Sequence, residues 1–116
     1  MSVIQPIIGT PDLARLRDFY AGVFGATEVF RTPEKGRVFY LGLRIGDSDL
    51  GLVAEKAGGP SKRYALSIEV ESVDDLLPLV EKHGGTVQPP NDMPWGQRVA
   101  HAEDPDGNLV NLTQNL

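Results

Sequence analysis

The stretch Ser48-Asp49-Leu50-Gly51-Leu52 recurs in altered form as Gly107-Asn108-Leu109-Val110-Asn111, at an offset of 59 residues (107 − 48). In both stretches a polar turn leads into a more apolar run. Two predicted helix starts, at Asp12 and Ser72, lie at an offset of 60 residues (72 − 12). The chain is therefore expected to consist of two similar halves.

Each half has the same predicted order of strand, helix and three further strands. In the first half Thr10 is expected to cap the helix and Gly25 to end it, and in the second half Ser72 and Gly84-Gly85 take these roles. Pro78 is awkward inside the second helix, because an interior proline removes one helical hydrogen bond. The expected strands cover residues 3–9, 27–31, 37–45, 49–55, 64–70, 86–89, 98–103 and 108–114.

The length of 116 residues fits one domain of the α+β class. We expect module one over residues 3–56, a Gly- and Pro-containing linker over 57–61 and module two over 62–116. An isolated module would leave one sheet face uncovered. Two βαβββ modules placed side by side would form a curved mixed sheet with a concave pocket and with the helices on the outer face.

The composition excludes several classes of protein. Without cysteine there is no disulfide framework, thiolate nucleophile or zinc–cysteine site. The net charge of -5 argues against nucleic-acid binding, which needs clustered Lys and Arg. Since the sequence has neither a signal-peptide pattern nor a long apolar stretch, we expect a soluble, cytoplasmic protein without a membrane role.

Two groups of motifs carry a resemblance to a known superfamily. The segment Thr10-Pro11-Asp12-Leu13, with Asp18-Phe19-Tyr20 and Val23-Phe24-Gly25, resembles the first helix of glyoxalase and bleomycin-resistance proteins. Pro94-Trp95-Gly96-Gln97-Arg98 and Asp104-Pro105-Asp106-Gly107-Asn108-Leu109-Val110 resemble their closing hairpin. The chain thus resembles the vicinal-oxygen-chelate superfamily, and in appearance its metal-free, bleomycin-resistance-like members most.

This resemblance implies a paired βαβββ fold, a pocket in the sheet and often a homodimer. It does not fix the activity, because such relatives include metal-dependent lyases, isomerases, dioxygenases and proteins that only sequester an antibiotic.

The resemblance also implies where a metal would bind. The matching positions carry Gln5, Leu52, Ala65 and Asn111. A transition metal needs three or four good donors, usually imidazole, carboxylate or thiolate. Leu52 and Ala65 have no donor, and the other two side chains are neutral amides. We therefore expect neither a metal nor another cofactor.

Strand alternation then predicts the lining of the pocket. If Gln5, Ala65 and Asn111 face the concavity, the same face carries Ile7, Leu50, Leu52, Ala54, Ser67, Glu69, Leu109 and Thr113. Phe39 or Tyr40 also reaches it, and the sequence leaves open which. Such an apolar lining with a few amides and hydroxyls suits a small organic ligand.

Three further residues are candidates for contact with a ligand, and of these Trp95 is expected at the pocket rim. Trp95 is expected either to stack on a ligand or to act as a structural lid. Arg98 is expected to pair with an anionic ligand group, or else with Glu69 or Glu103. His101 is a candidate for hydrogen bonding or stacking. The set of candidate ligand-binding residues is Gln5, Ile7, Phe39, Leu52, Ala65, Ser67, Trp95, Arg98, His101 and Asn111.

Three functional hypotheses follow. The first is a metal-independent protein that binds a small organic molecule such as an antibiotic or another aromatic compound. The second is a lyase, isomerase or dioxygenase with a displaced metal, or with acid–base chemistry at His101, Glu69 or Glu103. The third is an accessory domain without a ligand.

Overall fold

The computed structural model describes residues 2–56 and 63–116. The chain divides into two compact units, Met1–Gly58 and Gly59–Leu116. The linker expected at 57–61 lies outside the described residues, and the single-domain arrangement with a shared curved sheet stays a prediction.

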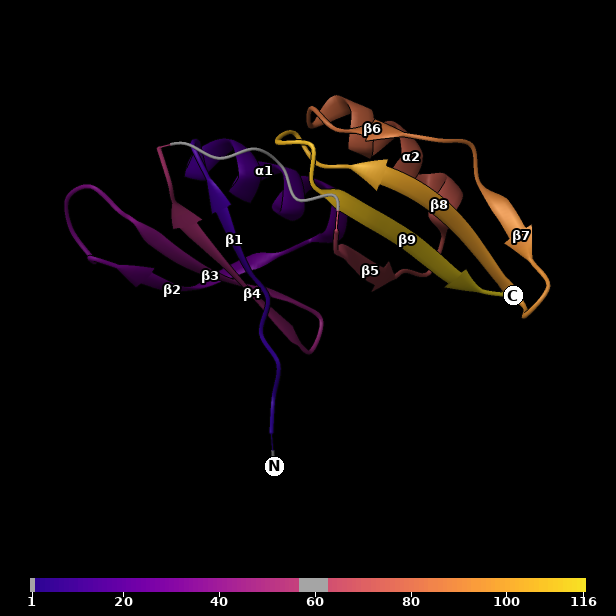
Figure 1. Cartoon of the computed structure of the whole chain (residues 1–116), viewed down its shortest axis with the longest axis horizontal. Coiled ribbons are helices and arrows are strands. Elements are labelled where there is room, and N and C mark those ends of the chain that lie inside the picture. The colour runs from indigo at the N-terminus through magenta and orange to yellow at the C-terminus, as the bar shows by residue number, and fades with distance from the viewer. Residues whose placement is uncertain (1, 57–62) are drawn as a thin grey trace. The chain divides into compact units, whose positions relative to one another are not determined.

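The first unit folds in the order strand, helix and three strands (Figure 1). Its sheet has the order β1-β4-β3-β2, in which β1 runs parallel to β4 and the other neighbours are antiparallel. The helix packs on β3 and β4. The elements are β1 (Ile7–Thr10), α1 (Leu13–Phe24), β2 (Thr27–Thr32), β3 (Tyr40–Ile45) and β4 (Ser48–Ala54).

The start of α1 differs from the prediction. Asp12, and not Thr10, is the N-cap, because its carboxylate accepts a hydrogen bond from the backbone N–H of Arg15. Thr10 instead ends β1, with its hydroxyl accepting from the N–H of Asp12. Gly25 ends the helix as predicted, at φ 71°, a left-handed conformation that glycine adopts without a steric penalty.

The second unit repeats this order and adds one short strand. Its main sheet has the order β5-β9-β8-β6, and β7 pairs with β8. Figure 1 shows β8 and β9 as its longest strands, with β5 beside β9 and β7 beside β8. The elements are β5 (Ala65–Glu69), α2 (Val73–Lys82), β6 (Thr86–Val87), β7 (Asn91–Met93), β8 (Gln97–Glu103) and β9 (Leu109–Asn115).

Several predicted boundaries change, while Ser72 caps α2 as expected. The strands expected to begin at Val3 and Arg37 begin at Ile7 and Tyr40. The sequence pattern does not predict β7, a strand of three residues that starts with Asn91 and Asp92, two residue types that strands disfavour.

Each unit buries the apolar side of its helix against its own sheet. In the first unit the buried residues of α1 are Leu16, Phe19, Tyr20 and Val23, and those of the strands include Leu41, Leu43, Leu50 and Leu52. In the second unit Val73 and Val80 of α2 are buried, as are Ala100, Ala102, Val110 and Leu112 of the sheet. The α+β class and the βαβββ order are thus confirmed. Among the described residues no helix is long and apolar enough to span a membrane.

Candidate ligand-binding faces

The sheet of the first unit carries two paired glycines on the face that α1 does not cover. Gly42 lies opposite Gly51 in the β3–β4 ladder. A Cβ atom at Gly51 would meet the hydroxyl and ring of Tyr40, and one at Gly42 would lie 3.0 Å from the Cβ of Phe30. The Tyr40 ring therefore lies over Gly51 and the Cβ atom of Phe30 over Gly42, and the centroids of the two rings are 6.0 Å apart in an edge arrangement.

Gln5 and Ile7 complete this surface. The side-chain amide of Gln5 donates a hydrogen bond of 3.1 Å to the Tyr40 hydroxyl. Ile7 and Phe30 stay 61% and 55% exposed, so apolar surface is available for contact. We call Ile7, Phe30 and Tyr40 the aromatic face.

Tyr40, and not Phe39, shares this face with Gln5. Phe39 precedes β3 and is 55% exposed, and its backbone binds Thr32 and Ala54. Because adjacent extended residues point to opposite sides of a sheet, only one of the two rings lies beside Gln5.

The expectation that Leu50, Leu52 and Ala54 line the open face is wrong. Leu52 is fully buried, and Leu50 is 4% exposed. Leu52 lies opposite Leu41 in the ladder, on the side where α1 packs. Gly51 is the residue of β4 that takes the open side.

The open face of the second sheet is polar where that of the first sheet is apolar. Ser67, Asn111 and His101 are neighbours across β5, β9 and β8. The Nδ1 atom of His101 lies 2.8 Å from the Oδ1 atom of Asn111. Because an amide oxygen only accepts, this contact holds the proton on Nδ1 and leaves Nε2 of the neutral ring as an acceptor. Ala65 also lies on this face but offers no donor atom.

A chain of side-chain hydrogen bonds crosses the other end of the same face. The indole N–H of Trp95 donates to Gln97 Oε1 over 2.9 Å, and Gln97 Nε2 donates to Asn115 Oδ1 over 3.1 Å. Asn115 Nδ2 then donates to Glu69 Oε1 over 2.9 Å. Gln97 and Asn115 are not among the predicted site residues. Each lies four residues from His101 or Asn111 on a strand, and this spacing puts them on the same face.

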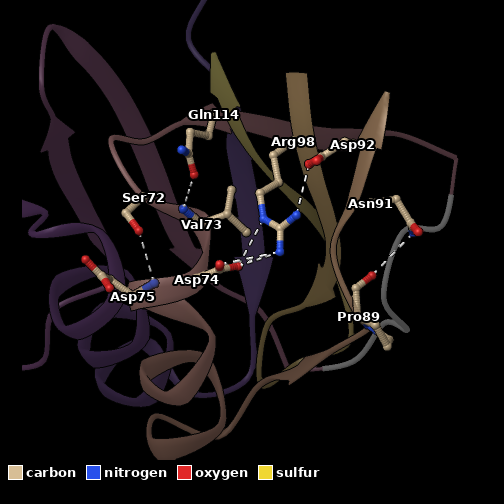
Figure 2. A network of polar contacts seen from close by, with 9 residues as sticks. All are labelled: Ser72, Val73, Asp74, Asp75, Pro89, Asn91, Asp92, Arg98 and Gln114. Atoms are coloured by element: carbon tan, nitrogen blue, oxygen red, sulfur yellow. Dashed lines mark hydrogen bonds and ion pairs between the residues drawn. The ribbon is translucent and has the colours of Figure 1, made fainter. Parts of the chain in front are cut away.

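Arg98 lies on the other side of the sheet and binds protein carboxylates. It donates from Nε to Asp74 over 3.1 Å and from Nη1 to Asp92 over 2.9 Å. Figure 2 shows the guanidinium between these two side chains, which belong to α2 and β7. Its hydrogen bonds to Asp92 and to Asp74 raise its pKa above the ordinary value. The expected partners Glu69 and Glu103 are not the ones it binds.

The family follows from a comparison with known proteins. The sequence profile of the Glyoxalase/Bleomycin resistance protein/Dioxygenase superfamily matches residues 3–112. The chain belongs to this superfamily. No curated protein matches it in a sequence search.

Several solved structures of superfamily proteins have a similar fold. A glyoxalase/bleomycin resistance protein/dioxygenase family enzyme from Burkholderia phytofirmans PsJN is 25% identical with a TM-score of 0.81, and 97% of each chain is covered. A bleomycin-binding protein complexed with bleomycin is 22% identical with a TM-score of 0.73, covering 100% of both chains. A variant of the fosfomycin resistance protein FosX from Listeria monocytogenes, complexed with Mn(II) and a dihydroxypropylphosphonic acid, is 16% identical. Its TM-score is 0.82, with 99% of this chain and 92% of that chain covered.

The donor chemistry of this superfamily member does not fit a resident metal at the positions that the resemblance implies. The Gln5 amide is bound to Tyr40, and the Asn111 amide oxygen is bound to His101. Ala65 and Leu52 supply no ligand atom. Within residues 2–56 and 63–116, no group of three or more His, Cys, Asp or Glu is placed to hold a metal ion.

Proposed function

We propose that this superfamily member binds a small organic ligand without a metal. The observation that carries the proposal is the donor set. Neutral amides stand at two of the four positions for metal ligands, and both already bind neighbouring side chains, Tyr40 and His101. Exposed rings beside amides and hydroxyls suit contact with an aromatic or drug-like compound.

The relatives support binding of an antibiotic as the function to test first. One structure of the same fold contains bleomycin, whereas another contains Mn(II) and a phosphonic acid. If this chain acts like the bleomycin complex, it is a binding protein without a metal. If it acts like the Mn(II) complex, it is a metal-dependent enzyme. The neutral donor set of this chain favours the first.

The test combines metal analysis with a bleomycin titration. Protein purified without chelators should contain far less than one equivalent of zinc, nickel, iron or manganese. Bleomycin should bind equally well before and after EDTA treatment in isothermal titration calorimetry. Near-stoichiometric metal, or bleomycin binding that EDTA abolishes, would contradict the proposal.

The enzymatic alternative is favoured by one observation, the orientation of His101. Asn111 holds its Nδ1 proton, so Nε2 is available as a base on the exposed side of the sheet. Mass spectrometry of bleomycin after prolonged incubation separates the two functions. Binding alone returns the ligand unchanged, whereas a lyase, isomerase or dioxygenase acting on it alters its mass or its chromatographic retention.

We also propose that the two units form one domain and that the protein is a homodimer. The edge strands of a sheet carry backbone N–H and C=O groups without a partner strand, and pairing between two copies of the chain can satisfy them. Light scattering at micromolar concentration should give twice the mass of the chain, and a monomer alone would contradict this part of the proposal. The cytoplasmic location stays a prediction.

A further inference from the structure

The hydrogen-bond chain from Trp95 to Glu69 has one direction along its whole length. An indole N–H can only donate, and a carboxylate can only accept. Glu69 therefore requires the nitrogen side of the Asn115 amide, which turns the amide oxygen of Asn115 toward Gln97. Gln97 in turn presents its nitrogen to Asn115 and its oxygen to Trp95. Both ends demand the same orientation of the two amides, so each bond supports the next.

The backbone around Trp95 is fixed as well. Trp95 lies in the turn of residues 94–96 between β7 and β8, which the N–H of Gly96 closes on the carbonyl of Met93 at 3.0 Å. The N–H of Leu116 binds the carbonyl of Gly96 at 2.9 Å, which ties the turn to the end of β9. The indole is thus attached to the sheet through its nitrogen and through its backbone.

Trp95 nevertheless exposes 68% of its surface. A ring that served as a lid would bury one face against the core, whereas this ring is held at its edge and stays largely exposed. An exposed tryptophan without a partner would sample several rotamers, and a ligand would lose affinity by having to fix one of them. The hydrogen bond from the indole N–H to Gln97 lowers that cost before a ligand arrives.

We propose that Gln97 and Asn115 are positioning residues that hold the indole of Trp95 as a stacking surface for a planar aromatic part of the ligand, with Glu69 as the fixed end of the chain. This inference rests on the proposed function. It adds a role for two residues that contact Trp95 or each other. It also makes Glu69 a structural acceptor and not an acid–base group.

The first measurement needs no ligand. Trp95 is the sole tryptophan, so emission excited at its red edge reports on this indole alone. Gln97→Met keeps the length of the side chain and removes the acceptor, and it should lower the fluorescence anisotropy and increase quenching by acrylamide. Gln97→Glu keeps an acceptor for the indole but loses the donor to Asn115, so it should restore both values in part. Gln88→Met, at an exposed glutamine after β6, is the control and should change neither.

The second measurement uses bleomycin as the probe. Gln97→Met and Asn115→Leu should weaken its binding by about 2- to 10-fold, the range expected when one aromatic contact is lost or misplaced. Circular dichroism and the melting temperature should stay near those of the Gln88→Met control.

Unchanged anisotropy and quenching in Gln97→Met would overturn the positioning role whatever bleomycin does. A mobile indole with unchanged bleomycin affinity would overturn the stacking role. Failure of the unaltered protein to bind bleomycin would count against the proposed function and the stacking role, while the ligand-free result would still decide the orientation of Trp95.

Discussion

The two units place different side chains at equivalent points of the same strand and helix order. Beside the parallel strand pair, Gly51 of the first unit corresponds to Asn111 of the second, and Ile7 corresponds to Ser67. The first unit has glycines, Gly42 and Gly51, at the centre of its sheet, and the side chains of Phe30 and Tyr40 lie over them. The second unit keeps polar side chains there, and Asn111 binds His101. One scaffold thus yields an apolar surface and a hydrogen-bonding surface, and the implied metal positions lack a strong donor in both.

The largest expected effect comes from the helix-facing side, where the two units are alike. Leu52 and Leu112 are equivalent and both are fully buried. Leu52→Ala and Leu112→Ala should each lower the free energy of unfolding by about 2–5 kcal/mol, because each leaves a cavity. Urea unfolding measures this, and Ile7→Ala, at a residue that is 61% exposed, is the control. If Leu52→Ala costs no more than Ile7→Ala, Leu52 lies on the open face and our assignment of the two faces fails.

That assignment shows where prediction from sequence succeeds and where it stops. The cap of α2 at Ser72, the end of α1 at Gly25 and most strands follow from local chemistry, which acts within a few residues. Faces depend on register, and a slip of one residue moves every side chain of a strand to the other side.

The residues of β4 were assigned to the wrong face because the final hairpins of the two units have loops of different length. Aligning them through their turns gives an offset of 59. The ladders pair Ile8 with Leu52 and Ile68 with Leu112, which is an offset of 60 in both strands. Nor does the sequence predict the partners of Arg98, because α2 and β7 approach it only in the folded unit.

The next effect distinguishes the two open faces. Gly51→Ala should cost about 1–3 kcal/mol, because the new Cβ meets the Tyr40 ring and must displace it from Gln5. The equivalent change Asn111→Ala should cost less, about 0.5–1.5 kcal/mol, because it removes one hydrogen bond to His101 and introduces no overlap.

Thermal unfolding of the single variants and of the double variant Gly51→Ala/Tyr40→Ala provides the check. The second change should make the first one much less costly, since the obstructing ring is gone. Strictly additive losses would show that Tyr40 does not cover Gly51.

A smaller effect concerns the arginines, which connect different parts in the two units. Arg98 joins α2 to β7, whereas Arg44 joins the neighbouring strands β3 and β4 through Asp49 (Figure 2 for Arg98). Arg98→Met should speed amide hydrogen exchange in residues 91–93, because β7 loses a side-chain connection to α2 and keeps only its pairing with β8.

Arg44→Met is the matched control for this change. It should leave exchange in β7 as it was and affect only the β3–β4 hairpin. Equal exchange in β7 for both variants would mean that backbone pairing with β8 alone holds this short strand.

The smallest effect is the pH dependence of the Arg44–Asp49 pair. Arg44 donates from Nε to Asp49 Oδ1 over 2.7 Å and from Nη2 to Oδ2 over 3.3 Å. The hydrogen bond from Arg44 lowers the pKa of Asp49 below its ordinary value of 3.8. A carboxylate whose pKa is lower in the folded state stabilises the protein above its unfolded-state pKa and loses this contribution as the pH falls through the folded-state pKa.

The melting temperature of the unaltered protein should therefore exceed that of Asp49→Asn near neutral pH, and the difference should shrink below about pH 4. Because the pair is exposed to solvent, the difference should be small and should also shrink in high salt. A difference that stays constant from about pH 6 to about pH 3 would mean that the charge of Asp49 does not contribute, and that the hairpin of the first unit depends on its backbone ladder alone.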